Sequence, residues 1–191
     1  VGDSDKGNTI SSNGYGVSFL VNTEIGNPVI GNTIFDNPNG SIGQYSNIQK
    51  LASPTLFSAY VNSTNDSLII NHSGISETSS ENFLVDIFSN SSSPAIPQGE
   101  NIIKSKLSIT SDDLSTKTLA IPYTGSSNVF ISTTFTDDRL VTSEFSNVVQ
   151  LLPETSSPSA VYSFLSLSAD HTSNWYSEHT LQITNNGSNN K

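Results

Sequence analysis

Gly7-Asn8-Thr9-Ile10 returns 24 positions later as Gly31-Asn32-Thr33-Ile34, and this repeated tetrapeptide decides the fold expected for the first part of the chain. A period of this length is too long for a hairpin. It fits one coil of a stacked repeat protein, in which no single unit buries its core alone. Gly-Asn turns separate short apolar runs here, and glycine takes positive φ at little cost. The pattern therefore predicts the terminal coils of a right-handed parallel β-helix.

The repeat also predicts which residues stack on one another. Ile10 is expected to lie over Ile34 in the coil interior, and Asn8 over Asn32 in a ladder of side-chain amides. We expect the stack to begin upstream of these coils. The residues expected to form the last part of its apolar core are Val17, Phe19, Ile30 and Ile34.

A second pattern begins near residue 51, where apolar runs recur with turn residues between them. Short strands at such spacing are typical of an antiparallel sandwich, and their number fits an immunoglobulin-like domain. Cysteine is absent, so the domain lacks the antibody-type disulfide. We expect no helix anywhere in the chain. The expected strands are 54–61, 67–72, 82–89, 101–109, 117–122, 128–136 and 140–151.

Alternation within these strands predicts which faces are buried. Strand 128–136 alternates apolar and hydroxyl side chains and is expected to be half buried. Strand 82–89 carries apolar residues on both faces and is expected to be central. The predicted sandwich core is Phe57, Val85, Ile87, Val129, Ile131 and Phe145.

These patterns divide the chain into three parts. Residues 1–46 are expected to be terminal β-helix coils, and residues 47–152 the immunoglobulin-like sandwich. Residues 153–191 are expected to be a linker and a strand-forming tail that could belong to a second sandwich. The fold class predicted for the whole chain is all-β.

Composition and charge restrict the possible partners. Seventeen Asp and Glu stand against seven Lys and Arg, giving a net charge of −10. Nucleic acid requires Lys and Arg to neutralise its phosphates, and anionic lipid attracts the same residues. No apolar run approaches the length of about 18 residues that spans a bilayer. We therefore expect no nucleic-acid partner and no membrane insertion.

The order of the segments resembles that of bacterial secreted and surface proteins of the CSLREA-associated type, in which a right-handed parallel β-helix runs into an immunoglobulin-like domain. The segment at 31–37 is similar to a final coil, and 47–56 is similar to the strand at the junction. The segments at 83–90, 130–137 and 142–146 are similar to sandwich strands. The resemblance implies an extracellular or cell-surface stalk or display module, without a characterised activity.

No residue pattern indicates catalysis, and we expect the chain not to be an enzyme. Glycoside hydrolysis usually needs two carboxylates that face each other across a groove. The acids of the first segment lie at its start or in different turns: Asp3, Asp5, Glu24 and Asp36. A nucleophile elbow and a Gly-rich phosphate loop are also missing.

Two sets of residues remain as candidate binding sites. Acidic pairs in predicted loops could bind calcium, which takes several oxygen ligands, although their spacing matches no known calcium loop. These are Asp112, Asp113, Asp137 and Asp138. Trp175 and Tyr176 could stack on sugars; the alternative is that Trp175 is buried in a core. No other cofactor is expected.

The function that we favour from the sequence is a non-catalytic structural and adhesive module that caps and spaces a β-helix. One alternative is an accessory carbohydrate-binding module of a secreted polysaccharide-active enzyme. Another is a subunit of an extracellular filament or surface layer whose tail donates strands to a neighbour. The possible partners are surface glycans or neighbouring subunits.

Overall fold

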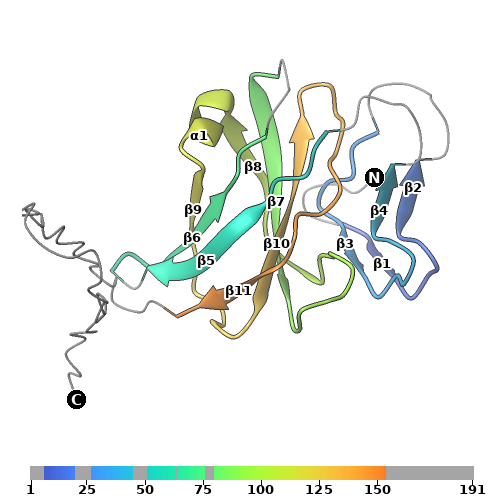
Figure 1. Cartoon of the computed structure of the whole chain (residues 1–191), viewed down its shortest axis with the longest axis horizontal. Helices are drawn as coiled ribbons and strands as arrows, with labels where there is room; N and C mark the ends of the chain where they lie inside the picture. The colour runs from blue at the N-terminus through green and yellow to red at the C-terminus, as the bar shows by residue number, and fades with distance from the viewer. Residues whose placement is uncertain (1–6, 20–26, 45–50, 63, 76–79, 154–191) are drawn as a thin grey trace, which may run out of the picture. The chain divides into compact units, whose positions relative to one another are not determined.

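A computed structural model describes residues 7–19, 27–44, 51–62, 64–75 and 80–153 of the chain. The regular secondary structure of the described part is almost entirely β-strand, as the sequence predicts (Figure 1). The chain divides into two compact units, Val1–Glu154 and Thr155–Lys191, and all described residues belong to the first. The described residues contain no helix long and apolar enough to cross a membrane.

The first part of the chain forms two pairs of parallel strands (Figure 1). We name residues 7–19 the outer layer and residues 27–44 the inner layer. In one pair, β1 (Thr9–Ser11) of the outer layer lies beside β3 (Thr33–Phe35) of the inner layer, with Ile10 opposite Ile34. In the other, β2 (Val17–Phe19) lies beside β4 (Ile42–Gln44). The predicted stacking of Ile10 on Ile34 is thus confirmed.

Backbone conformation repeats together with the sequence. Ser12 and Asp36 occupy equivalent turns and have φ of 58° and 54°, the left-handed region that short polar residues tolerate. Gly7 and Gly31 also correspond in sequence, and each has its own reason to be glycine: Gly31 has a φ of 68°, and Gly7 lies against the inner layer. A Cβ on Gly7 would lie only 1.4 Å from the carbonyl oxygen of Gly31.

The rest of the described chain forms one seven-stranded sheet in the order β8-β7-β10-β11-β5-β6-β9. All neighbouring strands are antiparallel except β11 and β5, which are parallel. The strands are β5 (Leu56–Asn62), β6 (Ser67–His72), β7 (Asn82–Asn90), β8 (Asn101–Thr110), β9 (Thr118–Pro122), β10 (Phe130–Asp137) and β11 (Val149–Leu152).

The sheet curls around its own apolar core. Inward side chains from all seven strands meet in one cluster, in which Ala59, Ile70, Val85, Ile87, Ile131 and Phe135 have no exposed surface. Val129 is partly buried against this cluster. The predictions for Val85, Ile87, Val129 and Ile131 as core residues are therefore confirmed.

Phe57 was wrongly predicted as a core residue, because β5 contains a bulge. Leu56 pairs with His72 and Ser58 with Asn71, so Phe57 is the extra residue between them. A bulge reverses the alternation that follows it. Leu56 takes the inward position, and Phe57 remains 64% exposed.

The predicted strand 140–151 is reduced to β11 at its end. Before β11 the chain still follows β10, but serine hydroxyls take the place of strand carbonyls. The Phe135 amide donates to the Ser143 hydroxyl at 3.1 Å, and the Thr133 amide donates to the Ser146 hydroxyl at 2.9 Å. Phe145 lies in this segment and packs away from the main core, in a second cluster.

The prediction that the chain has no helix is also wrong. The short helix α1 (Ser111–Ser115) follows β8, and its first turn contains Asp112 and Asp113, which were predicted to lie in a loop. Thr110 and Asp113 form a capping box that satisfies amides at the helix start. Only Leu114 of α1 is buried.

Strand β10 is buried on both faces, whereas its alternation predicted one solvated face. Ile131 and Phe135 point into the main core, and Ser132, Thr134 and Thr136 lie on the opposite face, yet all five are at most 2% exposed. The Ser132 hydroxyl donates to the Gln98 carbonyl of the loop before β8. The hydroxyls of Thr136 and Thr142 lie 2.9 Å apart. Ser132 and Thr136 are thus buried with hydrogen-bond partners from covering segments.

Candidate functional site: the interface between the inner layer and the sheet

Hydrogen bonds and apolar packing join the inner layer to the sheet at one face. An apolar cluster fills it. Phe88 of β7 and Phe145 stack edge to face with their ring centroids 5.2 Å apart, against Ile34 of β3. The other members of this cluster are Val29 and Ile42, with Ile10, Val17 and Phe19 partly buried against it.

This cluster also explains the apolar character of β7 on both faces. Val85 and Ile87 point into the main core, and Phe88 points to the inner layer. β7 lies between β8 and β10, so its predicted central position is confirmed. The predicted coil residues Ile30 and Ile34 are buried, whereas Val17 and Phe19 are only partly buried.

Backbone hydrogen bonds join the two parts at the same face. Ile34 and Gly99 form an antiparallel bridge in which each amide donates to the other's carbonyl, at 2.8 and 2.9 Å. The Val29 amide donates to the Thr142 hydroxyl at 2.9 Å. Gly99 must be glycine here, because a Cβ would lie 2.5 Å from the Phe88 ring and 2.8 Å from Phe145. The edge of β3 that faces away from the outer layer is thus covered.

Asp86 is a buried carboxylate in this face, and no sequence pattern predicts a role for it. It is 2% exposed and lies on β7 between Val85 and Ile87. Its Oδ1 accepts from the Ser105 hydroxyl and the Lys106 amide of β8, both at 2.9 Å. Its Oδ2 accepts from the amide of Gly31 in the inner layer. A buried charge is tolerated only when hydrogen bonds replace water, and these three contacts do so.

Between the layers, asparagine side chains form two ladders. The backbone amide and the Nδ2 of Asn8 donate to Oδ1 of Asn32, at 3.0 and 3.2 Å, which confirms the predicted amide ladder. The Asn13 amide likewise donates to Oδ1 of Asn37 at 3.0 Å. Nδ2 of Asn37 donates to the Phe35 carbonyl, and Nδ2 of Asn13 makes the equivalent bond to Ser11.

The second ladder was missed because its flanking residues differ. Asn13 precedes a glycine and Asn37 a proline, so no repeated string marks the pair. The signal that could have found it is the common spacing of 24 that it shares with Asn8 and Asn32.

The acidic residues predicted to bind calcium lie in two separately bonded turns. Thr110 and Asp137 stand at the ends of β8 and β10, and both strands end beside the start of β7. The topology therefore brings both acidic pairs to one end of the sheet. Within the described ranges, no three His, Cys, Asp or Glu side chains gather in a way that could hold a metal ion.

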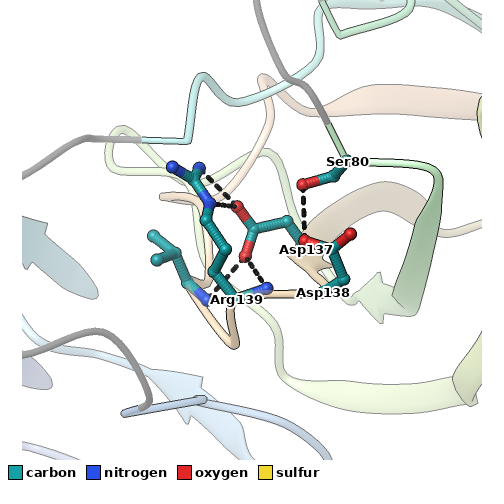
Figure 2. Close-up of polar contacts among 5 residues, drawn as sticks. Ser80, Asp137, Asp138 and Arg139 are labelled. Carbon is teal, nitrogen blue, oxygen red and sulfur yellow. Dashed lines mark hydrogen bonds and ion pairs between the residues drawn. The ribbon is translucent and has the colours of Figure 1, made fainter.

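Three of the four candidate carboxylates, those of Asp113, Asp137 and Asp138, accept hydrogen bonds from other residues of the chain. Hydrogen bonds from the backbone and hydroxyl of Thr110 lower the pKa of Asp113. Asp137 pairs with Arg139 and accepts the backbone amides of Arg139 and Val141, at 3.0 and 2.9 Å (Figure 2). Asp138 accepts from the Ser80 hydroxyl at 2.8 Å (Figure 2). Asp112 is the second residue of α1 and is exposed.

The predicted sugar-binding residues Trp175 and Tyr176 lie outside the described residues, as does the predicted tail. Of the first-segment acids that were weighed for hydrolysis, Asp36 alone is described, and it is exposed in the turn after β3. The calcium and glycan sites therefore stay predictions.

No family model matches the chain, and no curated protein matches it.

Proposed function

We propose that the chain is a non-catalytic structural and adhesive module of a secreted or cell-surface bacterial protein, in which an immunoglobulin-like sandwich caps and spaces a right-handed parallel β-helix. The observation that carries the proposal is the two-way bridge between Ile34 and Gly99. An uncovered strand edge offers free amides and carbonyls to other chains, and capping units of repeat proteins prevent such pairing. The loop before β8 covers this edge from within the chain.

Strand order supports the sandwich part of the proposal. The strands β5, β6 and β9 have the order A-B-E of one immunoglobulin sheet, and β8, β7, β10 and β11 have the order C′-C-F-G of the other. The parallel contact of β5 with β11 joins the two sheets at one edge. The parallel pairing of β1 with β3 and of β2 with β4, with ladders at a constant spacing, supports the β-helix part.

Removing the contact between Ile34 and Gly99 tests the capping role. Gly99→Val places a branched side chain against Phe88 and Phe145, so the loop must move away from Ile34. Ser92→Val introduces the same side chain at an exposed position of the same loop and serves as the control. Sedimentation velocity over a range of concentrations should show association of Gly99→Val and a monomer for the control. If both variants remain monomers at every concentration, the edge does not need a cap.

The adhesive part is tested separately with a glycan array and purified full-length chain. Trp175→Ala and Tyr176→Ala should abolish any saturable signal, and Phe57→Ala, which removes an exposed aromatic ring from β5, is the matched control. Binding that persists in both tail variants would assign recognition to another surface. An array without any signal would leave the capping role alone.

A further inference from the structure

We infer that β7 and the loop before β8 form a template for the end of the layer stack, in which Asp86 and Gln98 serve as the last rungs of the two asparagine ladders. The inference rests on the proposed capping function and names the residues that perform it. It also predicts which part depends on which for its ordered structure: the inner layer depends on the sheet, and the outer layer depends on the inner layer.

The ladders follow one rule between the layers. A backbone amide of the outer layer donates to the side-chain oxygen of an asparagine in the inner layer. Asn8 donates to Asn32 in this way, and Asn13 donates to Asn37. Both acceptors are nearly fully buried, so each bond lies away from water.

A similar arrangement, shifted by one residue along the chain, is found one level further on, where the sheet takes the place of a third layer. The Gly31 amide, next to Asn32, donates to Asp86 Oδ2. The Asp36 amide, next to Asn37, donates to Gln98 Oε1 at 3.0 Å. The bridge of Ile34 with Gly99 lies between these two contacts in the sequence. The sheet thus offers two side-chain oxygens and one backbone edge, which are the kinds of group that a further layer would offer. The backbone contact differs in direction, since Gly99 pairs antiparallel with Ile34 and the layers pair in parallel.

The two kinds of acceptor differ in what holds them in position. Asp86 is fixed by Ser105 and Lys106 of β8, so the sheet alone orients its carboxylate. Nδ2 of Asn32 is fixed by the Ile30 carbonyl at 3.0 Å, within the inner layer. The sheet can therefore present its acceptor before any layer is ordered, whereas Asn32 requires an ordered inner layer. The segment that fits this template is a layer with two ladder asparagines. The residue before each asparagine donates its backbone amide to the template, as Gly31 and Asp36 do.

Amide hydrogen exchange of the full chain, followed by NMR, tests the direction. The Ile34 amide donates to Gly99 and reports the contact of the inner layer with the sheet. The amides of Thr33 and Val17 donate to Asn8 and Ser41 and report the contact between the layers. The Ser146 amide, which donates to Thr133, reports the sheet itself.

Gln98→Ala and Asp86→Asn weaken the template, and Asn32→Ala weakens the ladder between the inner and outer layers. In Gln98→Ala and Asp86→Asn, exchange at Ile34, Thr33 and Val17 should accelerate together, by about tenfold for the loss of one net hydrogen bond. Exchange at Ser146 should not change. In Asn32→Ala, Thr33 and Val17 should accelerate and Ile34 should keep its protection. Gln98 is only partly buried, so its variant remains informative if Asp86→Asn does not fold.

Two results would overturn the inference. One is an Asn32→Ala variant in which Ile34 loses as much protection as Thr33, because order would then not start at the sheet. The other is a Gln98→Ala variant in which Ile34 accelerates and the contacts between the layers do not. Association of Gly99→Val is independent of both results, so failure of the capping function is seen separately.

Discussion

The side-chain oxygen of Asn32 accepts both the backbone amide and the side-chain Nδ2 of Asn8, from a residue 24 positions earlier in the chain. Asn32 is 2% exposed, so its polar atoms have little access to water. The bond is therefore part of the packing between the layers and has measurable consequences.

Replacing Asn32 should destabilise the layers selectively. Asn32→Ala leaves the Asn8 amide without its acceptor and is expected to cost about 1–3 kcal/mol. Asn39→Ala, at an exposed position of the same layer, should change stability by less than about 0.5 kcal/mol. Urea unfolding monitored by circular dichroism measures both. Equal losses in the two variants would show that the ladder bond contributes nothing specific.

Two neighbouring glycines should respond differently to the same substitution. A Cβ on Gly16 would lie 2.2 Å from the Ser41 carbonyl oxygen and 2.6 Å from the Ile34 side chain. A Cβ on Gly14 would meet only the Asn39 side chain, at 3.3 Å. Gly16→Ala should therefore lower the melting temperature by several degrees, as expected for about 1–3 kcal/mol of overpacking. Gly14→Ala should melt close to the parent chain, and a reversed order would contradict the layer contact.

Replacing phenylalanine by alanine should lower the free energy of unfolding strongly at the interface and only slightly at the surface. Phe145→Ala opens a cavity beside Phe88 and Ile34 and is expected to cost about 3–5 kcal/mol. Phe57→Ala removes the same atoms from a side chain that is 64% exposed, with a change of about 0.5 kcal/mol or less. Chemical denaturation of the two variants is the measurement. A mild effect of Phe145→Ala would mean that the second cluster does not hold the layers.

His72 predicts a dependence of stability on pH. It is fully buried in β6, its Nδ1 accepts from the Gly74 amide at 3.0 Å, and its Nε2 has no hydrogen-bond partner in the described structure. Burial, and then the positive charge of Lys117, lower the pKa of His72 below 6.5. The unfolded chain therefore binds more protons in the range between the folded pKa and 6.5. The contribution of neutral His72 is complete above this range and is lost as the pH falls through it.

His72→Asn isolates this contribution, because an amide oxygen can still accept from Gly74 without titrating. The free energy of unfolding should fall between about pH 7 and pH 5 more steeply in the parent chain than in the variant. Carboxylates that titrate at lower pH contribute equally to both chains, so the difference reports His72. Parallel curves over this interval would exclude the effect.

The ion pair at the end of β10 should matter for the turn that follows. Asp137 is 2% exposed and accepts the amides of Arg139 and Val141. Asp137→Ala is expected to cost about 2–4 kcal/mol, because it leaves two backbone amide donors without this acceptor. Asp138→Ala loses one bond to Ser80 and should cost about 1 kcal/mol. Comparable losses in thermal unfolding of the two variants would show that the bonds of Asp137 contribute no more than the single bond of Asp138.

The sequence predicted those features that a local repeat or alternation marks. The repeated Gly-Asn-Thr-Ile string identified the register of Ile10 with Ile34 and the rung between Asn8 and Asn32. Alternation located six of the seven strands of the sheet within a few residues. It failed at Phe57, because a one-residue bulge leaves no trace in composition. It also failed before β11, where the hydroxyls of Ser143 and Ser146 replace backbone acceptors.

The main residues of the interface could not be found in this way. Asp86 is a single acid in an apolar strand, and its partners are distant in sequence, in Gly31 and in β8. Gln98 lies in a loop without periodicity and contacts Asp36 across 62 positions. Such contacts depend on how the strands cross, which local patterns do not encode. A lone carboxylate between Val85 and Ile87 was the available signal that this face is covered.

The parallel contact of β5 with β11 has a mechanical consequence. The chain enters the sheet at the start of β5 and leaves it at the end of β11, and these two points lie at opposite ends of the paired strands. Tension along the chain therefore slides the strands past each other and loads their hydrogen bonds together. The Asn147 side chain, which bonds both the amide and the carbonyl of Leu56 at 2.7 and 2.9 Å, adds to this seam. A domain pulled in this direction resists force by shear along the seam, whereas a hairpin pulled at its open end yields one bond at a time.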